Sequence, residues 1–332
     1  MVINSKKINE IIIGQGAIEW LSEKCREYFP AGRAFILTDS NIAPLWLEKT
    51  INRLKKDGIS VFSYIFKAGE NSKNKTTLFE ILDEMQRLGL TRSDFLIALG
   101  GGVTGDMGAL AAALYNRGIP VIQLPTTLLA MVDSSIGGKT GINTQYGKNL
   151  IGVFHQPAFV ICDTDFLSTL PQTEITNGVA EIIKYGAVCD KEIFEALETG
   201  FEKCNAEEII EKCVKIKTDI ADKDETDKAI RLILNFGHTF GHAVEKLSGY
   251  TVPHGVAVAK GMVLAAEKSE KEDICPVGTA ERIKNCCKVN LLDTACEYSM
   301  SELLSAAEND KKKTNEGLRF ILLEEIGKAV IR

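Results

Sequence analysis

Three of the four histidines in the chain lie within 17 residues of one another, a pattern that indicates metal chemistry. His238 and His242 are four residues apart in NFGHTFGHAVE, so they would share one face of a helix. Pro253 would end that helix, and His254 would stand at the start of the next one. Imidazole nitrogens and carboxylate oxygens bind a borderline metal such as zinc, and a catalytic site keeps coordination positions open. We therefore predict a catalytic metal site, against the alternative of two histidines on a helix surface and one at a helix end. The site would not be that of a metalloprotease of the H-E-x-x-H type, because Thr239 stands where the glutamate would be.

Three lysines stand in settings where lysine is uncommon. Lys139 in SSIGGKTGIN and Lys148 in YGKNLIG lie in glycine-rich segments that we expect to be loops. Lys184 lies in the apolar helix GVAEIIKYGAV, three residues after Glu181. Each alone is explained by solvent exposure, or by an apolar stem whose ammonium reaches water. Together they predict a pocket for an anion, in which point charges and backbone donors converge on phosphate or carboxylate.

A glycine-rich loop is the third feature with chemical meaning. FLIALGGGVTGDMG places Gly100, Gly101, Gly102 and Gly105 between a predicted strand and a predicted helix. Backbone N–H groups of such a loop can bind a pyrophosphate at the helix N-terminus. The pattern alone is weak, and a plain strand-to-helix turn explains it equally well. It also follows about the fourth predicted strand, and no acidic strand end lies about 20 residues downstream, which differs from the usual dinucleotide fingerprint.

The elements that would position these residues differ between the two halves of the chain. The first half alternates buried strands with amphipathic helices, which predicts a mostly parallel, Rossmann-like α/β sheet covered on both faces. The strands are predicted at 11–14, 34–38, 61–66, 95–100, 120–125 and 159–163, and the helices at 17–28, 41–57, 74–88 and 104–117. Amphipathic helices dominate from 172 to about 308, with one strand at 318–323. We expect an α/β domain at 1–165 and a mostly helical domain at 166–332.

Composition excludes several classes of function. The chain has 332 residues and a net charge of -6, which argues against general nucleic-acid or membrane-surface binding. No apolar run approaches the ~20 residues that a membrane span needs, and the first residues lack the features of a signal peptide. The nine cysteines include no C-x-x-C pair and are an odd number. We interpret them as reduced thiols of a cytoplasmic protein.

Several segments together resemble the 3-dehydroquinate synthase family, within the sugar-phosphate cyclase superfamily. They are GGGVTGD, LPTTLLAMVDSSIGGKTGIN, GKNLIGVFHQP, AEIIKYG, LNFGHTFGHAVE, HGVAVAKGM and the terminal DKKK with GLRFILL. The resemblance extends from about residue 10 to the end of the chain. It implies NAD and a divalent metal, zinc or cobalt, as cofactors, and a seven-carbon sugar acid phosphate as substrate. In that reaction the bound NAD oxidises a ring hydroxyl, phosphate is eliminated, the hydride is returned, and an aldol step closes the carbocycle.

The resemblance also implies roles for individual residues, position by position. The metal ligands would be Glu181, His238 and His254, with His242 as a proton-handling or orienting neighbour. NAD would be held by Asp39, Asn41, Glu70, Lys73, Gly101, Gly102, Val103, Asp106, Thr126, Thr127, Lys148, Leu167 and Thr169. The substrate would be held by Asp133, Lys139, Asn149, Lys184, Lys217, Arg231, Asn235 and one of Lys311 and Lys312. Arg117 in YNRG would reach the phosphate in a neighbouring subunit, which implies a homodimer.

Two positions depart from the family pattern, and rival interpretations remain. Val256 stands where the family commonly carries glutamate, which places a supporting partner of the metal region in doubt. Ala229 stands where glycine is usual. A cyclase that makes an aminated dehydroquinate would share nearly every motif, whereas SSIGGKTGIN and LNFGHT argue against the 2-deoxy-scyllo-inosose type. A metal-dependent polyol dehydrogenase would have no use for so many cations. A ligand-binding relative without activity would be expected to lack some of these residues.

Overall fold

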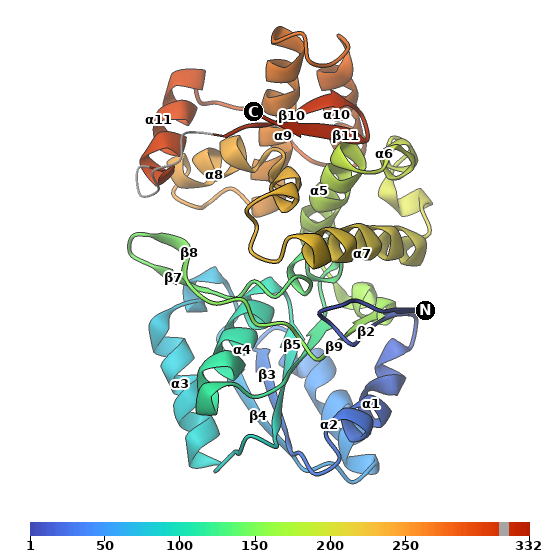
Figure 1. The fold of residues 1–332 in the computed structure, drawn as a ribbon, viewed down its shortest axis with the longest axis vertical. Coiled ribbons are helices and arrows are strands. Elements are labelled where there is room, and N and C mark those ends of the chain that lie inside the picture. The colour runs from blue at the N-terminus through green and yellow to red at the C-terminus, as the bar shows by residue number, and fades with distance from the viewer. Residues whose placement is uncertain (312–318) are drawn as a thin grey trace. The chain divides into compact units, whose positions relative to one another are not determined.

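A computed structural model describes residues 1–311 and 319–332 (Figure 1). The chain divides into two compact units. Unit 1 contains Met1–Pro171 and Lys217–Thr226, and unit 2 contains Gln172–Ile216 and Asp227–Arg332. Helix α7 (Ala206–Lys223) therefore contributes residues to both units. No helix among the described residues is long and apolar enough to cross a membrane.

Unit 1 is built on a seven-stranded sheet with the order β1-β2-β9-β6-β5-β3-β4. Only β1 pairs antiparallel with its neighbour, and the remaining pairings are parallel. The strands are β1 (Val2–Ile3), β2 (Glu10–Gly14), β3 (Ala34–Asp39), β4 (Val61–Phe66), β5 (Phe95–Gly100), β6 (Val121–Pro125) and β9 (Phe159–Asp163). The six strands predicted from apolar runs are thereby confirmed as strands, but β4 is not buried as predicted, because it lies at the edge of the sheet and exposes Ser63 and Ile65. The short β1 and the separate hairpin of β7 (Ile142–Thr144) and β8 (Gly147–Ile151) were not predicted.

Helices cover both faces of this sheet, as the fully buried strand β5 requires. Leu96 and Ala98 of β5 belong to a core cluster that also contains residues of α3 and α4. Phe95 points to the opposite face, because side chains alternate along a strand. It stacks on Phe29, just after α1, with ring centroids 4.9 Å apart. The α-helices are α1 (Leu21–Tyr28), α2 (Glu48–Lys56), α3 (Lys75–Arg87) and α4 (Gly102–Leu114). The shorter helical turns are η1 (Ala17–Trp20), η2 (Ala43–Leu47), η3 (Glu70–Ser72), η4 (Tyr115–Arg117), η5 (Ala130–Ser134) and η6 (Thr164–Thr169).

The strand order places a topological switch between β3 and β5. Strand β4 lies beyond β3 on one side, whereas β5 and then β6 follow on the other side. In open α/β sheets, ligands bind outside the carboxyl ends of the strands at such a switch. Strand β3 ends at Asp39 and β5 ends at Gly100. These residues therefore flank the position where the architecture favours a ligand.

Unit 2 is mostly helical, in agreement with the amphipathic pattern of the second half. Its helices are α5 (Gln172–Val188), α6 (Lys191–Leu197), the first part of α7, α8 (His238–Leu247), α9 (His254–Lys271), α10 (Thr279–Val289) and α11 (Met300–Lys311), with turns η7 (Phe201–Lys203) and η8 (Ile230–Asn235). The strand predicted at 318–323 corresponds to β10 (Ile321–Glu325), which pairs antiparallel with β11 (Lys328–Ile331). Strand β11 was not predicted.

Helices α8 and α9 approach each other closely because glycine lies at their contact. A Cβ atom at Gly261 would lie only 2.0 Å from the carbonyl oxygen of Gly237. Gly237 precedes α8 with φ +78°, a left-handed conformation that glycine adopts without steric cost. Since His238 begins α8 and His254 begins α9, this contact helps to fix the two histidines relative to each other.

A buried carboxylate anchors the start of β3 in unit 1. Asp94 is 1% exposed and accepts hydrogen bonds from Arg33 Nε at 3.0 Å and Arg33 Nη2 at 2.8 Å. It also accepts from the backbone N–H groups of Arg33 and Thr91, at 2.8 and 2.6 Å. Burial by itself would raise the pKa of Asp94, but these hydrogen bonds outweigh it and hold the pKa at about 2.

We expect Gly261→Ala to destabilise unit 2 by about 3 kcal/mol, because the new methyl group meets backbone that must shift. Thermal unfolding followed by circular dichroism measures the effect, with Lys271→Ala, an exposed position on the same helix, as the control. A melting temperature equal to that of the parent protein would contradict the close contact between α8 and α9.

We expect Asp94→Asn to lower the free energy of unfolding at pH 7 by about 2 kcal/mol. The pKa of Asp94 is lower in the folded than in the unfolded chain, so its contribution is complete above about pH 4 and is lost between about pH 4 and pH 2. Urea unfolding at pH 7 and at pH 3 measures this dependence, with the exposed Asp83→Asn as the control. An equal loss of stability in both variants at pH 7 would refute the anchoring role.

Candidate active site

Three predicted metal ligands converge in unit 2 from three separate helices. Glu181 lies on α5, whereas His238 and His254 begin α8 and α9. Their candidate ligand atoms all lie within 4.8 Å of one another. Glu181 Oε1 is 3.5 Å from His238 Nε2 and 3.0 Å from His254 Nε2. The starts of α8 and α9 thus bring the imidazoles of His238 and His254 together, and α5 brings the carboxylate of Glu181 to them.

The chemistry of this donor set fits a divalent metal. One carboxylate and two imidazoles supply three protein ligands, the number at which a catalytic zinc site keeps a position for water or substrate. The buried Glu181 forms an ion pair with Lys184. Burial alone would raise the pKa of Glu181, but the charge of Lys184, together with contacts to the imidazoles of His238 and His254, holds that pKa well below its usual range. Burial lowers the pKa of His254, but the carboxylates of Glu181 and Glu245 outweigh it and raise that pKa to about 10. The negative field that holds a proton on His254 would equally favour a metal cation.

The other predicted residues of unit 2 differ in exposure, and His242 and Lys184 lie beside this cluster. The ring of His242 lies 5.4 Å from that of His238 and 6.5 Å from that of His254, centroid to centroid, and His242 does not belong to the triad. Lys184 is 2% exposed. Its ammonium is therefore buried, and the alternative of a side chain whose ammonium reaches water is wrong. Arg231 is 1% exposed, and Asn235 ends η8 in a half-buried position. Lys311 ends α11, and Lys312 lies outside the described residues.

Residues expected to hold a dinucleotide gather at the topological switch of unit 1. Asp39 accepts hydrogen bonds from Asn41 N at 2.9 Å and from Thr104 Oγ1 at 3.1 Å, which ties the end of β3 to the first turn of α4. Helix α4 follows Gly101, which has no side chain to cap the N-terminal N–H groups of the helix. Such a helix end favours an anion. Gly102 and Val103 form the first residues of that helix.

Internal packing also requires small residues in this loop. A Cβ atom at Gly101 would lie 3.0 Å from Thr127 Cγ2, and one at Gly102 would lie 3.2 Å from Ser134 Oγ. Thr126 N donates to Gly100 O at 3.0 Å, which joins the ends of β6 and β5. Thr126 Oγ1 is buried and has no hydrogen-bond partner in the described part of the chain, and this hydroxyl fits a ligand that supplies one.

A second charged group lies within unit 1. Lys73 Nζ contacts Asp106 Oδ2 at 2.5 Å. Burial raises the pKa of Asp106. The positive charge of Lys73 opposes this rise, whereas the negative charges of Glu70 and Asp133 raise the pKa further. Asp133 and Lys217, both predicted to contact substrate, form an ion pair at 2.7 Å. The structure therefore brings together residues that the family resemblance assigns to NAD and residues that it assigns to substrate.

Of the two lysines expected in loops, Lys139 lies between named elements as predicted, whereas Lys148 does not. Lys148 lies in strand β8 and not in a loop, because the segment after Tyr146 folds back on β7 as a hairpin. Lys139 is exposed and pairs through an isolated bridge with Phe154. Asn149 is exposed, with φ +54°, a left-handed conformation that asparagine tolerates better than most residues.

Asn143 joins these segments, a role that sequence reasoning missed. It lies at an irregularity in the pairing of β7 with β8, and such bulges redirect a side chain. Asn143 Nδ2 donates to Glu70 Oε1 at 2.7 Å, and Asn143 Oδ1 accepts from Asn149 N at 2.9 Å. Asn143 N donates to Lys73 O at 2.8 Å. The residue closes the quoted motif GGKTGIN, but no pattern in the sequence shows which partners its amide meets.

The remaining predicted residues lie at the edges of unit 1. Thr169 Oγ1 accepts from Trp46 Nε1 at 3.0 Å, and Leu167 lies in the same turn, η6. Arg117 is exposed and has φ +67°, next to Asn116 with φ +50°. Two successive non-glycine residues with a left-handed backbone conformation are uncommon, and such backbone strain concentrates at functional sites.

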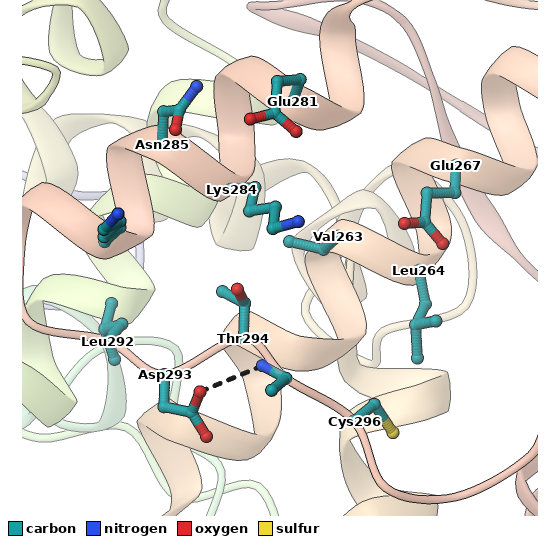
Figure 2. Close-up of a pocket in the computed structure, with 12 residues that line it drawn as sticks. Val263, Leu264, Glu267, Glu281, Lys284, Asn285, Leu292, Asp293, Thr294 and Cys296 are labelled. Atoms are coloured by element: carbon teal, nitrogen blue, oxygen red, sulfur yellow. Dashed lines mark hydrogen bonds between the residues drawn. The ribbon is translucent and has the colours of Figure 1, made fainter.

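A surface pocket of unit 2 lies apart from all of these residues (Figure 2). Its walls come from α9, α10 and the segment Leu292–Cys296, and Figure 2 shows Glu281, Lys284 and Asn285 along α10. Both acidic and basic side chains line it, and none of the predicted site residues does. We therefore assign it no part in the candidate site.

Comparisons with known proteins agree with this arrangement. The 3-dehydroquinate synthase N-terminal family model matches residues 63–177, and the C-terminal model matches residues 178–313. A 3-dehydroquinate synthase of Streptococcus gordonii is 40% identical over 331 residues, which cover 97% of this chain and 93% of the relative.

Two solved structures share the fold over the whole chain. A 2-deoxy-scyllo-inosose synthase complexed with carbaglucose-6-phosphate, NAD+ and Co2+ has a TM-score of 0.89 at 26% identity, covering 100% of this chain and 94% of the other. A 2-epi-5-epi-valiolone synthase from Streptomyces hygroscopicus with NAD+ and Zn2+ bound has a TM-score of 0.90 at 25% identity, with the same coverage. The α/β and helical architecture is thus that of sugar-phosphate cyclases, and the chain belongs to the 3-dehydroquinate synthase family.

Proposed function

We propose that this chain converts 3-deoxy-D-arabino-heptulosonate 7-phosphate into 3-dehydroquinate and phosphate, with NAD and a divalent metal ion, zinc or cobalt, as cofactors. One observation carries the proposal: Glu181, His238 and His254 form a compact set of metal ligands beside the buried Lys184. This combination suits a substrate that offers a hydroxyl to the metal and anionic groups to a lysine. The family membership reported above supports the same reaction.

The two cofactors, when bound, supply a reversible hydride acceptor and a Lewis acid for the substrate hydroxyl. The protein residues position and neutralise the substrate. The cationic side chains of Lys139, Lys184, Lys217 and Arg231 would hold its phosphate and carboxylate, with Asp133, Asn149, Asn235 and Lys311 or Lys312 completing the set. Holding a flexible dianion in one orientation lowers the entropic part of the barrier. His242, exposed at the edge of the metal cluster, would carry a proton to or from the substrate.

NAD would lie at the carboxyl ends of β3 and β5. Support comes from the topological switch there, from the uncapped N-terminus of α4 and from the buried hydroxyl of Thr126. Asp39 and Asn41 would border the site on one side, and Glu70, Lys73 and Asp106 on another. Thr127, Lys148, Leu167 and Thr169 would complete it. In this proposal unit 1 binds the nucleotide and unit 2 binds the metal.

We also infer that the chain acts as a homodimer in which Arg117 reaches the substrate phosphate of the neighbouring subunit. The exposed guanidinium and the left-handed backbone at Arg117 support this role, because a strained residue persists where its orientation matters. We further propose a cytoplasmic location, since all nine cysteines are free thiols and the cytoplasm keeps thiols reduced.

The decisive experiment is a turnover assay. Metal-loaded protein with catalytic NAD and 3-deoxy-D-arabino-heptulosonate 7-phosphate should release phosphate and dehydroquinate in equal amounts, without net NADH, and a chelator should abolish both. No product with this substrate, but turnover of its aminated counterpart, would replace the proposal with that cyclase. Net NADH from glycerol would indicate a polyol dehydrogenase, and tight NAD binding without turnover a non-catalytic relative.

We expect Lys139→Ala to lower kcat by roughly 100-fold or more while NAD affinity stays within about twofold of the parent. The lysine would stabilise substrate anions only, so its loss should spare the cofactor. Steady-state kinetics and fluorescence titration with NAD separate the two effects, and Lys67→Ala, exposed in the same unit, is the control. Unchanged turnover would remove Lys139 from the substrate site.

A further inference from the structure

Glu245 is a buried carboxylate to which the proposed reaction gives no role. It lies on α8, 3% exposed. It follows His238 by seven residues, which is almost two helical turns, so both side chains lie on the same side of α8. Burying a carboxylate is costly unless polar partners compensate for the lost water. The position of Glu245 therefore needs an explanation in terms of what it contacts.

Glu245 contacts the second imidazole of the metal cluster, that of His254. Glu245 Oε1 lies 3.6 Å from His254 Nδ1, whereas His254 Nε2 lies 3.0 Å from Glu181 Oε1. The two ring nitrogens of His254 thus face two different carboxylates. A proton on Nδ1 directed at Glu245 leaves the lone pair of Nε2 directed at the metal position.

The first imidazole is arranged in the same way by a different group. His238 Nδ1 lies 3.2 Å from the carbonyl oxygen of Phe236, and His238 Nε2 faces Glu181 at 3.5 Å. Metal-binding histidines ordinarily direct their second nitrogen to a carbonyl or a carboxylate, which fixes the tautomer and the ring orientation. Here the backbone carbonyl serves His238 and the carboxylate of Glu245 is placed to serve His254.

This arrangement answers the doubt raised by Val256. Val256 follows His254 by two residues on α9 and has no polar side-chain atom. The carboxylate beside His254 comes instead from α8, across the glycine contact at Gly261 that holds the two helices together. A supporting acid on α9 is therefore not needed to orient His254.

We propose that Glu245 is a positioning residue of the metal site, which holds His254 with Nε2 toward the metal and raises the affinity of the site for it. The inference rests on the metal site of the proposed function. It adds a residue that acts through His254 and touches neither metal nor substrate. Substitution of Glu245 should therefore weaken metal binding before it affects NAD binding, since the proposed NAD residues belong to unit 1.

The test measures metal affinity directly, on the full chain freed of metal by a chelator. Zinc affinity is determined by competition with a chromogenic chelator, and the absorption spectrum of the Co2+-loaded protein reports ligand geometry. The variants are Glu245→Ala, Glu245→Gln, in which the amide oxygen still accepts a hydrogen bond, and His254→Ala. Glu267→Ala, exposed on α9, is the matched control. NAD affinity and thermal stability without metal are measured alongside.

We expect Glu245→Ala to weaken zinc binding by about 10–100-fold and to change the cobalt spectrum. Glu245→Gln should lose only about 3–10-fold, and NAD affinity and metal-free stability should stay near those of the control. Zinc affinity within twofold of the parent in Glu245→Ala would overturn the inference, and so would an equal loss of NAD and zinc affinity, which indicates a structural role. If Glu245→Ala does not fold, Glu245→Gln decides, and unchanged zinc affinity there refutes the role. If the parent binds zinc no better than His254→Ala does, the metal site of the proposed function fails together with the inference.

Discussion

The buried charge of Glu181 is the constraint on which the helical unit depends. A carboxylate that is 1% exposed needs compensating positive charge, and it has Lys184 one turn along α5 and two imidazoles opposite. Buried ion pairs contribute little net stability, because desolvation offsets much of their attraction. A cluster of one acid, one lysine and two histidines in a helical core is therefore poorly explained by stability. It is well explained as a site whose charges act on a ligand.

Close backbone contacts place the two imidazoles beside the charge of Glu181. Gly261 and Gly237 let α9 and α8 approach to a distance that a side chain would prevent, and each helix starts with one of the two imidazoles. In unit 1 the same principle operates at the ends of strands. A Cβ atom at Gly101 or Gly102 would crowd Thr127 or Ser134, so glycine lets the first turn of α4 pack closely against these residues. Glycine thus has a structural reason at these positions.

The sequence allowed prediction of the features that depend on local pattern. Apolar runs located the six long strands. Five of them are buried on both faces of the sheet, whereas β4 lies at its edge and is partly exposed. The spacing of His238 and His242 on a helix, and of His254 after Pro253, was likewise readable. The sequence did not reveal the short strands β1 and β11 or the β7–β8 hairpin. Each of these strands has five residues or fewer, and the hairpin is rich in polar residues, so Lys148 was placed in a loop.

The partners of buried polar groups were also beyond local pattern. The residues alone left the carboxylate ligand open, because Glu181 comes from a helix remote in sequence, and only the family resemblance supplied it. Glu245 was overlooked because an acid on an amphipathic helix is usually solvated, whereas here it is buried against His254. Asn143 was overlooked for a different reason, because its two amide partners lie in segments that only folding brings together.

The contrast between Val256 and Glu245 shows how such a site tolerates sequence change. A carboxylate that orients a metal-binding histidine needs to reach only one nitrogen of the imidazole ring. Which helix carries that carboxylate makes no difference to the imidazole. Because α8 and α9 are held together by a glycine contact, a residue on α8 is as well placed to orient His254 as a residue on α9 itself. The ligands are constrained by the metal, whereas their supporting groups are constrained only by distance. Departures from a family pattern are therefore expected in the supporting residues before they are expected in the ligands.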